Sequence, residues 1–460
     1  MRIRIPAWAL IAAALLSLAQ VAPAEAAPAA ARKPPMGWNS WDAYGFTIDE
    51  GQFKAGAAEL AKLKALGWTY AVIDEGWYMD NPFGAKLADR AYQLDAHGLL
   101  VPSPKRFPSA ADGTGFKHLA AWAHARGLKF GIHIVRGIPK QAVEQNTPIA
   151  GSDFHAADAA DTSETCPWDD GDFGVRDNAA GQAYYDSMIR LYAGWGVDFL
   201  KVDCIADHPF RPTEIRQIHD AIRKVGGPMV LSLSPGPTQL EHADVVSRQS
   251  QMWRIADDIW DGWRFEQDGK PLAWPNGVAS AFDNLAKWSA YAGPGHWPDA
   301  DMLPFGVLKP HPGWGDPRVS GLTPDEARTQ FTLWAIARSP LILGANLTQL
   351  DDATRALITN RAVIAIDQTA WASHPVALPA GFEGFRAWIA LTGSRAHPTR
   401  YLAVFNLGDA PAHLAADWDQ LGLPSGRHGT RDLWSGARTA PATGPAVDLP
   451  AHGSTVFRVE

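Results

Sequence analysis

Short apolar runs alternate with longer amphipathic segments between residues 35 and 344. Apolar runs of this length, bounded by turn-like residues, predict buried strands. The eight predicted strands are Met36–Trp41, Tyr70–Trp77, Lys129–Val135, Val197–Cys204, Met229–Ser234, Gln251–Asp257, His296–Leu303 and Pro340–Gly344. The spacing of apolar residues between most of them predicts helices at Phe53–Gly67, Phe116–Gly127, Ala180–Gly196, Thr213–Val225, Ala279–Tyr291 and Pro324–Arg338.

Strands that alternate with helices imply an α/β fold with a parallel sheet. Eight strands, several ending in polar residues, favour a (β/α)8 TIM barrel, whose function lies at the carboxyl ends of its strands. An open doubly wound sheet is the alternative, but it should carry Gly-rich phosphate-binding turns that this chain lacks. Two segments depart from the alternation. Tyr78–Ser109 reads as an excursion, and Gly137–Ala179 is too long to be a simple connection.

The pattern changes after Gln368. Short apolar runs at 385–391, 401–406, 432–434 and 454–459 are separated by Gly, Pro and Asp, which predicts a small C-terminal antiparallel β domain. We place the boundary between Gln368 and Gly381. The catalytic barrel then covers residues 35–370, and a C-terminal β-sandwich domain covers residues 380–460.

The N-terminal residues have the features of a targeting segment. Arg2 and Arg4 precede an apolar run from Ala7 to Ala19, and a small-x-small cleavage pattern follows at residues 24–26. This run is too short to span a membrane, and no other segment is long and apolar enough to do so. We therefore expect a signal peptide at 1–26, a disordered lead at 27–34, and a secreted or periplasmic protein.

The charge and composition of the chain limit the classes of molecule that it could bind. The chain has 49 acidic and 41 basic residues, a formal net charge of −8, and no basic run. These features argue against nucleic acid and against a membrane surface as partners. The 20 Trp residues suit a core, but also the apolar faces of sugar rings. The pattern does not indicate an oligomeric state.

The chain has two cysteines, Cys166 and Cys204. In an oxidising compartment they would pair beside Asp203, and the alternative is two independent buried thiols. No CxxC or HExxH pattern occurs, so we expect no zinc site. Since GxGxxG and GxxxxGK[ST] loops are also missing, we expect no nucleotide cofactor.

Carboxylates at strand ends suggest the chemistry. Asp203 ends the predicted strand Val197–Cys204 and is our candidate nucleophile, while Asp257 and Asp258 follow another predicted strand. Two carboxylates that flank one bond are the usual equipment for glycoside hydrolysis. Aromatic neighbours would raise the pKa of a carboxyl that acts as the acid, because they exclude water. Any one of these residues taken alone could equally be a cap or an ion-pair partner.

Nine short motifs in one order make the chain similar to glycoside hydrolase family 27, the clan D α-galactosidases. They are 35–41 (PMGWNSW), 73–75 (IDE), 105–108 (KRFP), 201–203 (KVD), 253–254 (WR) with Asp258, 293–295 (GPG), 298–303 (PDADML), 333–336 (LWAI) and 363–368 (VIAIDQ). The resemblance implies a retaining hydrolase with Asp203 as nucleophile. The family spacing, an Arg and then an Asp four positions on, selects Asp258 rather than Asp257 as acid/base.

The resemblance also implies a set of residues that bind the terminal sugar. They are Trp41, Asp74, Glu75, Lys201 and Arg254. The chemistry agrees, because an indole offers a flat apolar face and carboxylates accept hydrogen bonds from sugar hydroxyls. Lys201 lies two residues before Asp203 on the same strand face, so we expect it to keep the nucleophile ionised.

Three departures from the family pattern concern the pocket wall. The family usually has two aspartates where this chain has Asp74 and Glu75. Its Cys-Glu-Trp run, which contacts the sugar 2-position, is replaced here by Leu-Ser-Pro around Ser234. A tyrosine of the third strand is replaced by His133, which we expect to contact sugar or to be a satisfied wall residue, and Arg136 follows it.

These departures leave the substrate open. The first expectation is hydrolysis of terminal α-D-galactosyl residues. The in-family alternative is β-L-arabinopyranosidase activity, because L-arabinopyranose lacks the hydroxymethyl group of galactose and the longer Glu75 could fill that space. The alternative from a different class is a carbohydrate-binding protein that has lost turnover, although the presence of both Asp203 and Asp258 opposes it.

Overall fold

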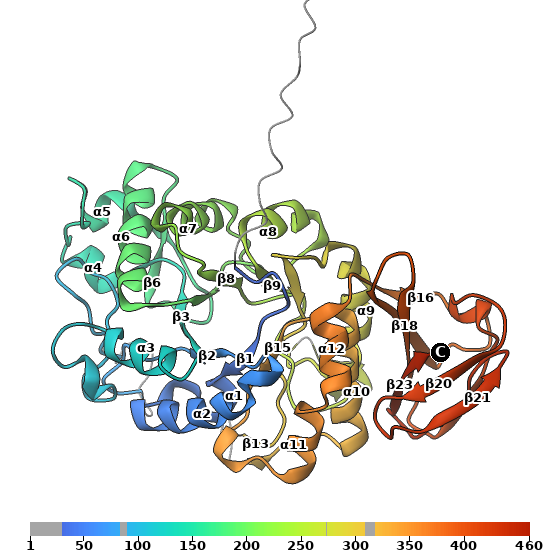
Figure 1. The fold of residues 1–460 in the computed structure, drawn as a ribbon. Coiled ribbons are helices and arrows are strands. Elements are labelled where there is room, and N and C mark those ends of the chain that lie inside the picture. Colours follow the sequence, from blue (N-terminus) through green and yellow to red (C-terminus); the bar gives the residue numbers. More distant parts are fainter. Residues whose placement is uncertain (1–29, 83–89, 273, 309–317) are drawn as a thin grey trace, which may run out of the picture.

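Eight parallel strands form the central sheet of the computed structural model (Figure 1), which describes residues 30–82, 90–272, 274–308 and 318–460. The predicted signal peptide therefore lies outside the described residues. The strands are β1 (Met36–Asn39), β2 (Tyr70–Ile73), β3 (Lys129–Val135), β7 (Phe199–Asp203), β8 (Val230–Leu233), β9 (Met252–Arg254), β12 (Trp297–Asp299) and β15 (Leu341–Leu343). Each corresponds to one of the eight predicted strands.

The sheet closes on itself. Its strand order is β12-β9-β8-β7-β3-β2-β1-β15, and a parallel bridge from Leu303 to Leu343 joins the two outermost strands. The Leu303 amide donates to the Ile342 carbonyl at 2.7 Å, and the Gly344 amide donates to the Leu303 carbonyl at 3.0 Å. The predicted (β/α)8 barrel is confirmed.

Most barrel strands are buried along their whole length, as expected for a parallel sheet covered on both faces. Strand β7 differs, because Lys201 and Asp203 are partly exposed while their neighbours are buried. Both residues lie on one face of the strand. The side chains that carry charge thus open into a space at the barrel mouth.

Helices surround the barrel (Figure 1): α2 (Glu50–Leu63), α3 (Lys117–His124), α6 (Ala179–Trp195), α7 (Pro212–Val225), α8 (Ala243–Gln249), α9 (Val278–Trp288), α10 (Pro324–Ala337), α11 (Asp352–Ile358) and α12 (Arg361–Thr369). Local sequence sets their ends. Thr323 and Glu326 form a capping box at the start of α10. Trp41, predicted to end the first strand, instead begins the short helix α1 (Trp41–Tyr44) after the strand stops at Asn39.

The long segment Gly137–Ala179 contains structure that the sequence did not predict. Its elements are β4 (Ile138–Pro139), α4 (Lys140–Glu144), α5 (Ala156–Ala159), β5 (Ala160–Thr165) and β6 (Asp172–Val175). The three strands pair antiparallel in the order β4-β6-β5. We call this segment the 137–179 excursion. Two further hairpins are β10 (Glu266–Gln267) with β11 (Lys270–Pro271), and β13 (Val307–Leu308) with β14 (Arg318–Val319).

The C-terminal residues form antiparallel sheets, as predicted. A six-stranded sheet has the order β16-β17-β18-β23-β20-β21, and β19 pairs with β22. The strands are β16 (Ala372–Val376), β17 (Phe385–Gly393), β18 (Pro398–Asn406), β19 (Ala412–Ala415), β20 (His428–Asp432), β21 (Arg438–Ala442), β22 (Ala446–Leu449) and β23 (Ser454–Val459). Strand β16 lies between the two predicted domain ranges, and of the predicted run 432–434 only Asp432 belongs to a strand.

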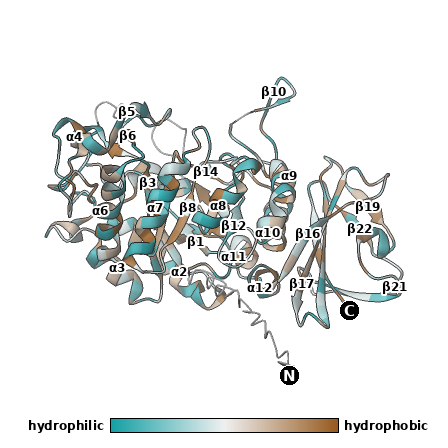
Figure 2. Cartoon of the chain, turned by 90° about the horizontal axis from the view of Figure 1, so that it is seen from above, coloured by the Kyte–Doolittle hydropathy of each residue, from teal (hydrophilic) through white to brown (hydrophobic). Residues whose placement is uncertain are grey.

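The C-terminal sheets pack against one side of the barrel, beside α9, α10 and α12, as Figures 1 and 2 show from two directions. Trp388, Phe405 and Val456 of this domain belong to the same buried cluster as the barrel core. The Trp434 indole donates to Thr332 of α10 at 3.1 Å. The barrel core therefore extends into one face of the C-terminal domain, which also has a separate apolar cluster around Ile389, Val404 and Trp418. Among the described residues, none of the helices combines the length and the apolar character that a membrane span requires.

Candidate active site

The carboxyl ends of the parallel strands meet at one rim of the barrel, where they surround a pocket of about 500 Å³. Strand β7 brings Lys201 and Asp203, the turn after β2 brings Asp74 and Glu75, and β9 ends at Arg254. The lining includes eight of the nine predicted site residues, namely Trp41, Asp74, Glu75, Lys201, Asp203, Ser234, Arg254 and Asp258. The ninth, His133, does not line the pocket.

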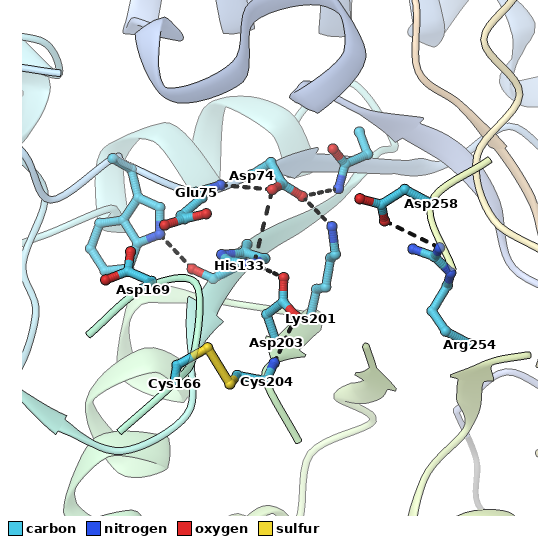
Figure 3. Close-up of polar contacts among 12 residues, drawn as sticks. Asp74, Glu75, His133, Cys166, Asp169, Lys201, Asp203, Cys204, Arg254 and Asp258 are labelled. Carbon is cyan, nitrogen blue, oxygen red and sulfur yellow. Dashed lines mark hydrogen bonds and ion pairs between the residues drawn. A yellow bond between two sulfur atoms is a disulfide. The ribbon is translucent and has the colours of Figure 1, made fainter. Parts of the chain in front are cut away.

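His133 lies fully buried on β3, behind the nucleophile candidate. Its Nε2 is 3.4 Å from Asp203 Oδ2 and 4.0 Å from Asp74 Oδ1 (Figure 3). In this position it contacts two site carboxyls instead of the pocket space. This position places His133 against Asp203 and outside the pocket lining, which is closer to the wall residue than to the sugar contact, the two roles that the sequence left open.

Asp203 is held as a carboxylate. Burial raises the pKa of its carboxyl, but the hydrogen bond with His133 and the nearby Lys201 ammonium outweigh burial, so the pKa lies below the usual range. The backbone amide of Cys204 also donates to Asp203 Oδ1 at 2.6 Å. An ionised carboxylate is the form that a nucleophile requires.

Lys201 acts on Asp203 less directly than its place on the strand suggested. Its Nζ donates to Asp74 Oδ2 at 2.8 Å, and Asn39 Nδ2 donates to the same oxygen at 2.6 Å. Burial raises the pKa of Asp74, yet the Lys201 charge, the neighbouring His133 and the hydrogen bonds from Lys201 and the Glu75 amide together outweigh burial and hold the pKa well below its usual range. Asp74 and Lys201 thus form a buried ion pair beside the nucleophile.

Glu75 has the opposite character. Burial raises the pKa of its carboxyl well above the usual range, and a hydrogen bond with Asp169 and the negative charge of that residue raise it further. Asp169 is in turn bound by Arg90 Nη1 at 3.1 Å and by the Gly171 amide at 3.0 Å. Glu75 is therefore a buried acid with a raised pKa, held against the anchored Asp169.

Asp258 stands on the other side of Lys201, beside Arg254 (Figure 3). Arg254 Nη2 lies 3.3 Å from Asp258 Oδ1 and 2.8 Å from Asp301 Oδ2, and the Trp274 indole donates to Asp258 Oδ2 at 3.1 Å. Burial raises the pKa of Asp301 to about 7. Asp257 also lines the pocket, so position alone does not separate it from Asp258.

The predicted disulfide between Cys166 and Cys204 is present. It ties the 137–179 excursion to the residue that follows Asp203, and it packs in a small buried cluster with Val135. Arg136 secures the same point, because its Nε donates to the Cys204 carbonyl at 2.9 Å and its Nη1 pairs with the buried Glu214 at 2.7 Å. The loop that carries Asp169 is thereby fixed beside the nucleophile.

Sequence reasoning missed Asp42, Arg90, Asp169 and Trp274, which all line the pocket. Arg90 and Asp169 lie in the two segments read as excursions, where no periodic pattern gives a position. Trp274 follows the β10–β11 hairpin, which has no apolar alternation. The described residues include no cluster of three or more His, Cys, Asp or Glu side chains suited to a metal ion.

Comparison with known proteins identifies the family of the chain. A family model described as α-galactosidase A matches residues 169–369, and one described as the α-galactosidase C-terminal β-sandwich domain matches residues 386–459. The α-galactosidase of Coffea arabica is 30% identical over 92% of this chain and 93% of its own length. A GH27 β-L-arabinopyranosidase from Geobacillus stearothermophilus is 39% identical, with a TM-score of 0.86 over 94% of this chain and 97% of its own.

The chain belongs to glycoside hydrolase family 27. It is a glycoside hydrolase of the α-galactosidase family, and its relatives differ in named activity. α-Galactosidase A of Cellvibrio japonicus is 29% identical over 93% of this chain and 92% of its own length, whereas an α-N-acetylgalactosaminidase of Gallus gallus is 27% identical over 88% and 87%. Family 27 membership thus establishes glycosidase activity while leaving the terminal sugar open.

Proposed function

We propose that this family 27 enzyme is a retaining exo-glycosidase that releases terminal β-L-arabinopyranosyl residues from glycans. In the first step an oxygen of Asp203 attacks the anomeric carbon while Asp258 gives its proton to the leaving oxygen, and the glycosidic bond breaks. In the second step Asp258 takes a proton from water. That water then displaces Asp203 and releases the sugar with its configuration retained.

The observation that carries the choice of sugar is the state of Glu75. It is buried and hydrogen bonded to Asp169, which Arg90 anchors, and the pKa of its carboxyl lies well above the usual range. Glu75 is one methylene longer than the aspartate that the family usually has, and it lines the pocket. L-Arabinopyranose is galactose without the hydroxymethyl group, so a wall that extends into the pocket favours it.

The relatives support this choice without deciding it. The β-L-arabinopyranosidase of Geobacillus stearothermophilus is 39% identical to this chain, while the curated α-galactosidases of Cellvibrio japonicus and Coffea arabica are 29% and 30% identical. Those α-galactosidases keep α-D-galactoside hydrolysis as the second candidate. Both sugars share the ring atoms that Asp203, Asp258, Asp74 and Lys201 would contact.

Ser234 bears on the 2-position of the sugar. Its hydroxyl is buried, lines the pocket, and has no hydrogen-bond partner within the described parts of the chain. A serine leaves more space than the usual glutamate and offers no charge. Arg254 therefore becomes the charged group that would read the 2-hydroxyl.

The experiment is a panel of aryl β-L-arabinopyranoside, α-D-galactoside and α-N-acetylgalactosaminide, measured on wild type, Glu75→Asp and Ser234→Glu. We expect the arabinoside to be the best wild-type substrate. Glu75→Asp should raise kcat/KM for the galactoside relative to the arabinoside by about 10- to 200-fold, the range for one methylene in a tight pocket. A fixed ratio in Glu75→Asp would remove Glu75 as the determinant and leave α-galactosidase as the simpler function.

The catalytic roles have their own test, with Asp257→Ala as the matched control for Asp258→Ala. Asp203→Ala should abolish turnover, and added azide should form a glycosyl azide of inverted configuration. Asp258→Ala should lose about 10²- to 10⁴-fold in kcat/KM for poor leaving groups, and azide should give a product of retained configuration. Near-normal activity of Asp203→Ala would reject the mechanism, and a larger loss in Asp257→Ala would move the acid to Asp257.

We also infer that the enzyme is exported. The charged, apolar and small-residue pattern of residues 1–26 supports this, and a disulfide beside the active site suits an oxidising compartment. N-terminal sequencing of protein recovered from the periplasm or medium should find a chain that begins near Ala27. Recovery of uncleaved protein from the cytosol alone would contradict export.

A further inference from the structure

Two of the large apolar side chains that the described residues leave exposed lie at the mouth of the same pocket. Trp168 is 39% exposed and Trp274 is 46% exposed, and both line the active-site pocket, whereas Phe154, Leu240 and Val319 do not. A single exposed apolar residue needs no explanation. Two indoles brought to one opening from segments about 100 residues apart indicate a surface built to meet a ligand.

Each indole is fixed by its surroundings. Trp168 follows the disulfide-bonded Cys166 in the 137–179 excursion, and its ring lies 5.3 Å from the imidazole of His208, in the loop after β7. Trp274 follows the β10–β11 hairpin, which stands clear of the barrel in Figure 2, and donates its Nε1–H to Asp258 at 3.1 Å. Neither ring has to be ordered from a mobile state when a ligand arrives.

The contact between Trp274 and Asp258 indicates which end of the pocket holds the leaving group. The acid must touch the oxygen that leaves, so the leaving group lies beside Asp258 and therefore beside Trp274. Trp41 and Phe46 form a separate aromatic corner, with their rings 5.1 Å apart, and Trp41 belongs to the set expected around the terminal sugar. The exposed indoles of Trp168 and Trp274 are thus placed to contact the leaving group, which lies across the glycosidic oxygen from the terminal sugar.

We propose that Trp168 and Trp274 form a binding site for the leaving group, and that its occupant is a second pyranose ring. This rests on the proposed function, because it takes Asp258 as the acid. The polar side chains His208 and Asp257 line the same pocket, and His208 lies against Trp168. A sugar ring presents apolar faces to the indoles and hydroxyls to these polar groups, which a purely apolar aglycone would leave unpaired.

The test compares three substrates that carry the same terminal sugar: a glycosyl fluoride, an aryl glycoside and a disaccharide. The terminal sugar is whichever one the wild type hydrolyses best among the aryl glycosides, so the result does not depend on the choice between arabinose and galactose. Fluoride leaves without a ring and without a proton from Asp258. It therefore reports the first chemical step with the leaving-group site empty.

Trp168→Ala and Trp274→Ala should each lower kcat/KM for the disaccharide by about 10- to 100-fold, in keeping with loss of one aromatic stacking surface. For the fluoride, kcat/KM should stay within about twofold of the wild-type value. For the aryl glycoside, the loss should lie between the losses for the fluoride and the disaccharide. Trp274→Phe keeps a ring but loses the hydrogen bond to Asp258, so it should retain most of the disaccharide activity. Phe154→Ala, which removes an exposed ring outside the pocket, is the control and should change none of the three.

Two results would overturn the proposal. Disaccharide kcat/KM within about twofold of wild type in both alanine variants would mean that no ring stacks there. An equal loss on all three substrates would mean that the indoles only support the site walls. Failure of the proposed function itself would look different. Either the wild type would not hydrolyse the fluoride, or Asp258→Ala would keep wild-type kcat/KM on substrates with poor leaving groups.

Discussion

His133 stands where family members carry a tyrosine, and its surroundings explain why a histidine suits that place. It is fully buried, and Nε2 faces Asp203 and Asp74 at 3.4 and 4.0 Å. Burial alone would raise the pKa of Asp203 and weaken it as a nucleophile. The hydrogen bond from His133 is the strongest of the influences that reverse this effect.

His133→Phe should therefore move the acidic limb of the kcat/KM profile to higher pH. Asp203 must be ionised to attack, so activity is present above its pKa and is lost as pH falls through it. Without the hydrogen bond the pKa rises, and the loss begins at a less acidic pH. His133→Asn, which keeps a donor, should shift the limb less. An acidic limb unchanged in His133→Phe would show that Asp203 owes its ionisation to Lys201.

At the scale of elements, prediction succeeded where the chain is apolar and periodic. All eight barrel strands and six of the surrounding helices could be found, because each buries a regular set of apolar residues. The β4-β6-β5 sheet could not, because strand β5 is mostly polar and only its first residue is fully buried. Its strands are held by pairing with one another, so no apolar alternation marks them.

The same distinction separates the site residues that were found from those that were missed. Asp203 and Arg254 sit at strand ends, where the fold alone gives their position. Asp169 lies in the excursion, and loop contacts such as the disulfide and the ion pair with Arg90 hold it beside Glu75. Trp274 reaches Asp258 across 16 positions of chain through a hairpin. Such contacts depend on loop conformation, which spacing along the chain does not encode.

Removing the disulfide should loosen this excursion. The bridge joins positions 38 apart, and closing a loop of that length is worth about 4 kcal/mol in the chain-entropy model. We expect Cys166→Ala/Cys204→Ala to lower the free energy of unfolding by about 2–4 kcal/mol. It should also raise KM more than it lowers kcat, because Asp169 and Trp168 lose their anchor. Wild-type KM in the double variant would show that Arg136 and Arg90 hold the excursion without it.

At the scale of the whole molecule, we expect the C-terminal sheets and the barrel to unfold together. The C-terminal domain has an apolar cluster of its own, but Trp388, Phe405 and Val456 belong to the buried cluster of the barrel, and His452 also joins both parts. Its ring stacks on Trp263 at 4.3 Å and contacts Glu326 of α10 at 2.7 Å, and its carbonyl accepts from Thr329 at 2.7 Å. The sequence suggests a linker between the two domains, but the two domains pack directly against each other.

Calorimetry should accordingly find one unfolding transition, with equal calorimetric and van't Hoff enthalpies. His452→Ala should shift that single transition to lower temperature, with a loss of about 1–3 kcal/mol from the stacked ring and the buried hydrogen bond. His413→Ala, whose partner Asp448 is exposed on the C-terminal sheets, is the matched control and should have little effect. Two separate transitions in wild type would show that the domains fold independently.

The placement of the aromatic rim has a consequence for how such an enzyme diversifies. Asp203 and Arg254 belong to barrel strands, where a substitution disturbs the shared core. Trp168 belongs to the 137–179 excursion and Trp274 follows the β10–β11 hairpin, and neither segment contributes a strand to the barrel sheet. Substitutions in these segments can therefore change which leaving groups the enzyme accepts, while the residues proposed to cleave the bond stay the same. A library randomised in these two segments could therefore be screened for activity on new glycans, with the catalytic residues of the barrel unchanged.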